Sequence, residues 1–403
     1  MFLPPTQLYL NMAMMSFLNS NAAFQLAKNE SLNWNPNLKN NADNLFAEIK
    51  KIDDVVKSGI DGEITKQSLA KLNKTIDGIK SFAEIKYQRD LSESEQKVIW
   101  QRGSTKLLDY TDGDSPLSSV IFVPSLINKS YIFDLSKKRS MVGFFKKKGL
   151  NCYILDWGEP TSDEEDFGIE DYILNRLNPA IENIYGRTGR KVILVGYCMG
   201  GLLSLAASLE HSEKIKSLAL LATPWDFKSA DIEKPVTNDL SLRIFDDYLA
   251  QNKIISGDLI HQLLYLLRTN AVHEKYERFA DMDLSTEQAK SFIEREHWLH
   301  DNMNMTAKVA RESFINWAAK NEPINGLWGV NKMQIDPSKI SVPTFISIAR
   351  YDKIIPPLCA SPLSALIHNS TTIYPKTGHI GMVAGVNAQQ NLWLPLEKWI
   401  KGL

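Results

Sequence analysis

Cysteine is scarce in this chain of 403 residues, which holds only Cys152, Cys198 and Cys359. Three widely separated cysteines cannot form a disulfide framework, and they show none of the paired spacings typical of a zinc site. We therefore expect no metal and no cofactor, and a reducing, cytoplasmic setting in which thiols stay free. Any functional cysteine in this chain is therefore expected to act as a free thiol.

An excess of charge of one sign is also missing. The formal net charge is -1, so the composition predicts no general affinity for nucleic acid or for an anionic membrane surface. No stretch approaches the roughly 18 uninterrupted apolar residues that a membrane-spanning helix needs. Internal repeats and low-complexity tracts are absent from the sequence. With 44% hydrophobic residues, the chain can bury a large core and should divide into more than one unit.

The first residues lack the features of an export signal. Residues 8–18 are apolar, but no lysine or arginine precedes Lys28, and asparagine interrupts the apolar run at Asn11. Neither a basic leader nor a continuous apolar segment is present. The segment is expected to be a helix that packs on the protein, with docking on a partner as the alternative.

The hydrophobic pattern changes near residue 95. Before that point apolar residues recur at helical steps, for example at Leu45, Ile49 and Ile52, and later at Leu69, Leu72, Ile76 and Ile79. From Val98 onward, short β-like runs take over. We expect a helical N-terminal region over residues 1–95 and a catalytic domain over residues 96–403.

Strands and helices alternate through the catalytic domain. Apolar strand candidates lie at 118–123, 151–156, 191–195 and 216–222, with a helix expected over 169–185. This alternation predicts a mostly parallel sheet covered on both faces. The rhythm stops between about residues 226 and 340, where helical runs such as 259–267 and 307–319 occur, and strands return at 344–349 and 371–374. An insertion there is typical of a helical cap over an active site.

The most informative motif is residues 196–201, Gly-Tyr-Cys-Met-Gly-Gly, between an apolar strand and an apolar helix. Such a motif predicts a nucleophile elbow, in which a strained turn holds the nucleophile at a helix N-terminus, here with cysteine in place of serine. Taken alone, a cysteine after a buried strand is often only a small core residue. A thiolate at an elbow suits thioester substrates, so acyl transfer from a coenzyme A thioester is the first hypothesis.

Two partners follow in the order that the elbow requires, acid and then histidine. Asp352 and His379 each occupy a loop after a strand candidate, where open α/β sheets collect functional groups. Separately, Asp352 is equally typical of a turn before two prolines, and a lone histidine is usually a surface residue. Behind a cysteine elbow they predict a Cys198, His379, Asp352 triad. Cys152 and Cys359 are interpreted as structural.

Several segments together resemble the polyhydroxyalkanoate synthases, nearest to the short types that work with a separate subunit. The resemblance runs from about Val123 to Trp399. It rests on residues 123–129 with 134–136, residues 155–160, the elbow, residues 296–298, residues 324–326, Asp352 with the two prolines, and residues 378–381. One departure is Lys353, which stands where the family commonly has histidine. The resemblance implies an α/β-hydrolase core with a cap. Together with the hydrophobic patterns, the expected fold is an α/β-hydrolase with a mostly parallel central sheet, a helical cap insertion over about 226–340 and a helical N-terminal region.

The resemblance also implies polymerisation of 3-hydroxyacyl-CoA into polyester with release of coenzyme A. Cys198 is then the nucleophile, His379 the general base and Asp352 its partner, and the backbone N–H groups of Met199 and Leu126 form the oxyanion hole. The alternatives are a polyester depolymerase, esterase or thioesterase with the same triad, and a non-catalytic scaffold on polyester granules. Expected partners are the acyl-CoA, the growing chain, and a second synthase subunit or a second copy. The expected location is cytoplasmic, at granule surfaces.

Overall fold

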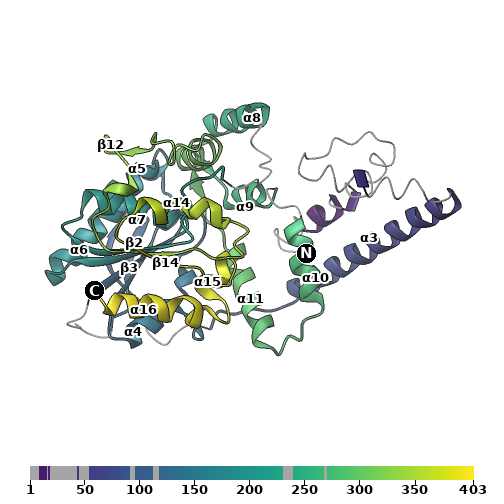
Figure 1. Cartoon of the computed structure of the whole chain (residues 1–403), viewed down its shortest axis with the longest axis horizontal. Helices are drawn as coiled ribbons and strands as arrows, with labels where there is room; N and C mark the ends of the chain where they lie inside the picture. The colour runs from purple at the N-terminus through teal and green to yellow at the C-terminus, as the bar shows by residue number, and fades with distance from the viewer. Residues whose placement is uncertain are drawn as a thin grey trace. The chain divides into compact units, whose positions relative to one another are not determined.

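A computed structural model describes residues 9–15, 17–18, 43–44, 54–90, 96–111, 118–229, 239–266 and 270–403. Its largest sheet has eight strands in the order β1-β2-β6-β3-β7-β8-β13-β14 (Figure 1). Its strands are β1 (Lys97–Arg102), β2 (Thr105–Asp109), β3 (Ser119–Val123), β6 (Asn151–Asp156), β7 (Val192–Tyr197), β8 (Ile215–Leu221), β13 (Thr344–Ser347) and β14 (Ser370–Ile373). The six neighbouring strands β6, β3, β7, β8, β13 and β14 pair in parallel. The two remaining strands, β1 and β2, are antiparallel to their neighbours. The mostly parallel sheet predicted from the sequence is confirmed.

Helices cover both faces of the sheet, which explains why its central strands are apolar throughout. Every residue of β3 and β7 is buried. Figure 1 shows α4 and α16 on one side of the sheet and α5 and α7 on the other. Val120 and Phe122 belong to the core cluster under α4 and α16, whereas Ile121 between them does not, as strand alternation requires. The covering helices are α4 (Met141–Lys147), α5 (Ile169–Tyr172), α6 (Asn178–Thr188), α7 (Met199–Glu210), α13 (Pro357–Ala360), α14 (Pro362–Leu366), α15 (His379–Ala384) and α16 (Leu394–Lys401).

Between β8 and β13 no described strand joins the main sheet. This stretch contains α8 (Asp239–Ala250), α9 (Gly257–Leu266), α10 (Asn270–Ala280), α11 (Glu287–His300) and α12 (Ala307–Ala310), which continues as a wider helical segment over Arg311–Ala319. Short strand pairs lie outside the main sheet: β9 (Ile254–Ile255) with β10 (Met305–Thr306), β11 (Gly329–Val330) with β12 (Met333–Gln334), and β4 (Asp134–Ser136) with β5 (Arg139–Ser140). The helical runs expected at 259–267 and 307–319 are helical at every described position.

The chain divides into two compact units, and their bounds differ from those expected. One unit combines residues 1–86 with 262–289, and the other combines 87–261 with 290–403. Part of the expected cap thus groups with the N-terminal region, because α3 (Asp54–Ala83) packs along α10: a Cβ on Gly78 would run into the carbonyl of Tyr276, and Phe82 lies edge-on to the Tyr276 ring. The larger unit begins before residue 96 because Arg89 donates a hydrogen bond to the carbonyl of Asp134.

Only part of the helix pattern expected in the N-terminal region falls within the described residues. Residues 9–15 and 17–18 are helical, and Leu72 and Ile79 of α3 are buried, whereas Leu69 is exposed. The expected positions Leu45, Ile49 and Ile52 lie outside the described residues. Within the described residues, no helix combines the length and the apolar character needed to cross a bilayer.

Candidate active site

Cys198 occupies a strained turn between β7 and α7. Its backbone has φ 55° and ψ -123°, a conformation that residues with a side chain rarely adopt. Two hydrogen bonds hold the turn: the Cys198 N–H donates to Leu221 O at 2.8 Å, and the Gly201 N–H donates to Cys198 O at 3.0 Å. The strand, turn and helix geometry predicted for the elbow is therefore present.

Glycine is required around this turn because neighbouring backbone lies where a side chain would project. A Cβ on Gly196 would stand 2.5 Å from the Cα of Gly201, so these two residues pack directly against each other. A Cβ on Gly200 would stand 2.5 Å from the carbonyl oxygen of Pro124, at the end of β3. The elbow is thus shaped by contact with the strand beside it as well as by its own turn.

Asp352 and His379 meet in a buried pair. The Nδ1 of His379 donates to the Oδ2 of Asp352 at 2.6 Å, and both side chains are almost fully buried. The other carboxylate oxygen accepts the backbone N–H groups of Ile354 at 2.9 Å and Ile355 at 2.8 Å. Asp352 is therefore fixed by its own loop, and His379 is the first residue of α15, which follows β14.

The His379 imidazole also interacts with Cys198, which brings the three predicted residues together. Burial on its own would lower the pKa of His379, but the Asp352 carboxylate and a side-chain hydrogen bond with Cys198 raise that pKa to about 10. The Tyr197 ring packs against the imidazole at 5.0 Å between ring centres. The imidazole is therefore held between a carboxylate and a thiol, and both partners favour its protonated form.

The two backbone groups expected to form an oxyanion hole lie beside this cluster. Met199 is the first residue of α7, so its N–H has no acceptor within the helix. Leu126 lies in the loop that follows β3, and β3 pairs with β7 up to Val123 opposite Gly196. Their joint role stays a prediction, and it is taken up in the proposal below.

The other cysteines are buried in the core. Burial raises the pKa of the Cys152 thiol well above its usual value. Cys359 is buried as well, and its carbonyl accepts the N–H groups of Trp225 and Asp226. Among the described residues, no three His, Cys, Asp or Glu side chains gather as a metal site would require. The expected absence of a cofactor stays a prediction.

One feature of the site was not predicted from the sequence. Trp157 and Trp298 each donate an indole hydrogen bond to the loop that carries Leu126, although they lie 33 and 169 residues away from their acceptors. Both residues belong to segments that resemble the synthases, but nothing in their spacing indicates these bonds. His297 beside Trp298 is predicted to serve packing, and its ring stacks on Tyr87 with ring centres 4.4 Å apart.

The family of proteins with the alpha/beta hydrolase fold matches residues 120–385, which covers the sheet, the elbow and His379. The chain belongs to this family. A second match, to the N-terminus of poly-beta-hydroxybutyrate polymerase, covers residues 66–145. The resemblance to polyhydroxyalkanoate synthases that the sequence motifs predict is confirmed.

Individual relatives agree with this placement. The chain is 25% identical over 333 residues to the poly(3-hydroxyalkanoate) polymerase subunit PhaC of Haloferax mediterranei, with coverage of 79% of this chain and 66% of the relative. It is 26% identical over 288 residues to the corresponding subunit of Allochromatium vinosum, with coverage of 70% and 80%. A solved structure of a putative lipase from Sulfolobus solfataricus has 16% identity and a TM-score of 0.44, and covers 77% of this chain and 99% of that one. The chain spans about two thirds of the length of the Haloferax relative.

Proposed function

We propose that this chain is a polyhydroxyalkanoate synthase that joins 3-hydroxyacyl units from coenzyme A thioesters into polyester, with Cys198 as the nucleophile. The observation that carries the proposal is a cysteine on a strained elbow with the buried His379 and Asp352 pair against it. The relatives described above, which are named polymerases, support polyester synthesis over other acyl transfers.

The first step is acylation of the thiol. The Cys198 sulfur attacks the thioester carbonyl as His379 takes the thiol proton, and the oxyanion is received by the N–H groups of Met199 and Leu126. When the tetrahedral intermediate collapses, the bond to coenzyme A breaks and the imidazolium returns the proton to the leaving sulfur. A His379 whose pKa is raised to about 10 holds this proton well at neutral pH.

The second step forms the ester bond. The 3-hydroxyl of an incoming hydroxyacyl-CoA attacks the acyl carbon on Cys198, and its proton passes to His379 as the Cys198 sulfur leaves and is reprotonated. The chain, now one unit longer and still a coenzyme A thioester, acylates Cys198 again and releases coenzyme A. Asp352 keeps the imidazole in the tautomer that both steps need.

Hydrolysis is the competing outcome, because water can replace the incoming hydroxyl. A depolymerase, esterase or thioesterase would use the same three side chains, and exclusion of water from the acyl-enzyme separates the two results. The product therefore decides between them: ester oligomers in a synthase, free hydroxy acid in a hydrolase.

The proposal extends to partners and place. The substrates are the acyl-CoA and the growing polyester, and the Haloferax and Allochromatium relatives are named as subunits. A second synthase subunit or a second copy of the chain completes the enzyme, which works in the cytoplasm at the surface of polyester granules. Light scattering of the purified chain, alone and with 3-hydroxybutyryl-CoA, tests the homodimer.

In the deciding experiment, the purified chain is incubated with 3-hydroxybutyryl-CoA. Thiol release is followed over time, and the acyl product is identified by mass spectrometry. Ester oligomers are expected from the unchanged chain, and Cys198→Ala should abolish release of coenzyme A. Cys152→Ala is the control, because Cys152 is buried in β6 and should not be needed. Release at an unchanged rate from Cys198→Ala would overturn the assignment of the nucleophile.

A further inference from the structure

The loop between β3 and the helical turn Ser130–Phe133 carries Leu126 and runs beside the elbow. Both of its ends are anchored through carbonyl groups by tryptophan side chains. The indole N–H of Trp157 donates to Pro124 O at 3.0 Å, and that of Trp298 donates to Lys129 O at 2.8 Å. One anchor follows β6 and the other lies on α11, so two separate elements hold the six residues 124–129.

Side chains of the loop also form hydrogen bonds, including one from Lys129 to Glu159 Oε1 at 2.7 Å. The Ser125 hydroxyl accepts the N–H of Ile127 at 3.2 Å, and the Asn128 side chain contacts the His261 ring at 3.1 Å. Gly200 of the elbow helix lies directly against Pro124, because a Cβ there would collide with its carbonyl. A shift of Pro124 would therefore move the backbone of the elbow and that of Leu126 together.

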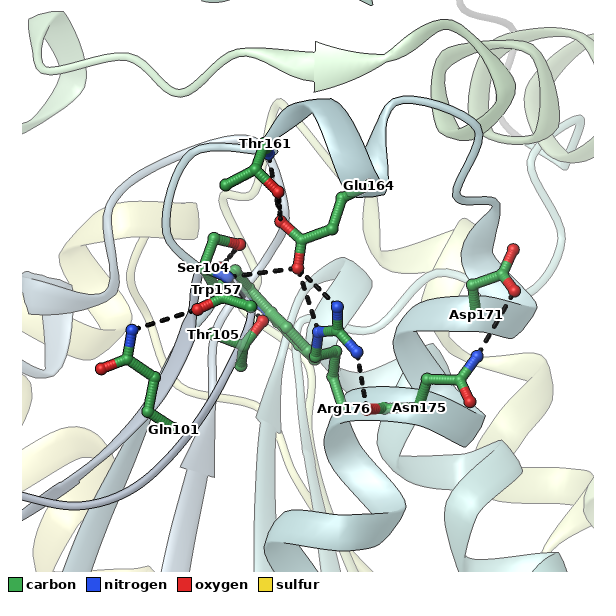
Figure 2. A network of polar contacts seen from close by, with 10 residues as sticks. Gln101, Ser104, Thr105, Trp157, Thr161, Glu164, Asp171, Asn175 and Arg176 are labelled. Carbon is green, nitrogen blue, oxygen red and sulfur yellow. Dashed lines mark hydrogen bonds and ion pairs between the residues drawn. The ribbon is translucent and has the colours of Figure 1, made fainter.

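Trp157 is itself held in place by a buried polar network (Figure 2). Its carbonyl accepts the hydroxyl groups of Ser104 at 2.8 Å and Thr105 at 3.1 Å. Behind Ser104 lies a buried ion pair in which Arg176 donates to Glu164 Oε1 at 2.6 Å, and the same carboxylate oxygen accepts the Ser104 N–H at 3.2 Å. The ion pair thus fixes the turn between β1 and β2, and this turn fixes Trp157.

Burial opposes the charge on Glu164, but the hydrogen bonds from Arg176, Ser104 and Thr161 outweigh it and lower the pKa of this carboxyl. The network therefore stays ionised and fully bonded at neutral pH. A satisfied buried network of this kind rigidifies the backbone around it.

We infer that Trp157 and Trp298 are positioning residues that hold the loop of residues 124–129 and so keep the Leu126 N–H aligned with the Met199 N–H. The inference rests on the proposed acyl transfer. Oxyanion donors act only when they stand about 2.7–3.1 Å from the developing charge, and loss of one donor typically costs 10²–10³ in rate. The loop has no regular backbone ladder to supply that accuracy. Besides the isolated β-bridge between Asn128 and Asn302, the two indole bonds fix its backbone at both ends.

The test separates oxyanion stabilisation from general damage to the site. Trp157→Phe and Trp298→Phe keep an aromatic ring and remove only the N–H donor. For each variant, the rate of Cys198 acylation by p-nitrophenyl butyrate is compared with the rate of Cys198 alkylation by iodoacetamide, located by peptide mass. Both reactions need the thiol and His379, but only acylation forms an oxyanion.

We expect acylation to fall roughly tenfold to a hundredfold in Trp157→Phe and less in Trp298→Phe, which anchors the far end of the loop, while alkylation stays within about twofold. The apparent KM should be unchanged, so that the loss appears in kcat. The matched control is Trp399→Phe, which makes the same exchange on α16, where the ring packs against Phe345 with ring centres 5.4 Å apart and lies outside the loop. Its acylation and alkylation should both stay near those of the unchanged chain.

Equal losses of acylation and alkylation in Trp157→Phe, or an acylation rate like that of Trp399→Phe, would overturn the inference. Failure of the proposed function looks different. In that case the unchanged chain would show neither acylation nor selective alkylation at Cys198, before any variant is made.

Discussion

The elbow around Cys198 and the loop around Asp352 position two of the three proposed reactive side chains by opposite means. The glycines of the elbow are buried, and backbone from β3 and α7 lies in close contact with them. The Asp352 loop is open to solvent, and Tyr351, Ile354 and Leu358 around the carboxylate are all exposed. Its carboxylate is instead fixed by backbone hydrogen bonds from Ile354 and Ile355.

The difference shows that steric packing positions Cys198, the proposed nucleophile, whereas hydrogen bonds position Asp352, the proposed acid. Added volume should therefore be damaging at the elbow and tolerated on the outside of the Asp352 loop. Removing the carboxylate that accepts hydrogen bonds should have the reverse effect. It should strongly reduce activity at Asp352 and leave the shape of the elbow unchanged.

The largest effect is expected from Asp352→Asn. Because two backbone N–H groups face Oδ1, the asparagine must turn its oxygen toward them and its amide NH₂ toward His379. His379 is then forced into the tautomer that cannot take the Cys198 proton, and such a change lowers turnover by roughly 10⁴ in a comparable triad. Release of coenzyme A from 3-hydroxybutyryl-CoA measures it.

Asp336→Asn serves as the control for that substitution. Asp336 caps a surface turn through the Ser338 N–H, and activity should stay near that of the unchanged chain. A loss of less than tenfold in Asp352→Asn would mean that the acid loop does not set the tautomer of His379.

Gly200→Ala tests the steric side of the comparison. The added methyl collides with backbone oxygens of Val123 and Pro124, so we expect destabilisation of about 1–3 kcal/mol or more, together with loss of acyl transfer. Gly186→Ala is the matched control, since a Cβ there meets nothing within 4 Å on the exposed face of α6. It should stabilise the protein by about 0.5–1 kcal/mol. Urea unfolding measures both, and equal stabilities for the two variants would refute the steric argument.

The pH dependence of stability tests the His379 pair. Asp352 and Cys198 raise the pKa of His379 from 6.5 to about 10 against the effect of burial. The folded state therefore holds this proton more tightly than the unfolded state does, and the resulting stabilisation is complete below about pH 6.5 and is lost as pH rises toward 10.

The measurement is the free energy of unfolding of the unchanged chain minus that of His379→Gln, taken in urea at several values between about pH 6 and pH 10. The difference should shrink as pH rises. A difference that stays constant or grows would show that His379 is not protonated in the folded protein.

The smallest effect is expected on the outside of the acid loop. Leu358→Ser replaces an exposed side chain, so stability should change by no more than about 0.5 kcal/mol. Tyr351→Ser should behave in the same way. Thermal unfolding measures both, and a loss well beyond that range would show that this surface is packed against something in solution.

Much of this protein could be predicted from local patterns. The apolar runs of β3, β6 and β7 predict a parallel sheet because strands buried on both faces carry apolar side chains throughout. The elbow was predictable because glycines at fixed offsets from Cys198 answer a steric demand of the turn itself. The grouping of residues 262–289 with the N-terminal region was not predictable, since helical periodicity identifies α10 without naming the helix against which it packs.

The amino-acid sequence by itself thus determined the order of strands and helices, the strained turn at Cys198 and the choice of the three side chains proposed to react. These depend on neighbours in the chain, through sterics and hydrophobic pattern. Only the tertiary structure decided which groups meet: His379 with Asp352 across 27 residues, Arg176 with Glu164 behind Ser104, and the two indoles with the loop of Leu126. A hydrogen bond needs a donor and an acceptor within about 3 Å, and packing brings together residues that the sequence keeps far apart.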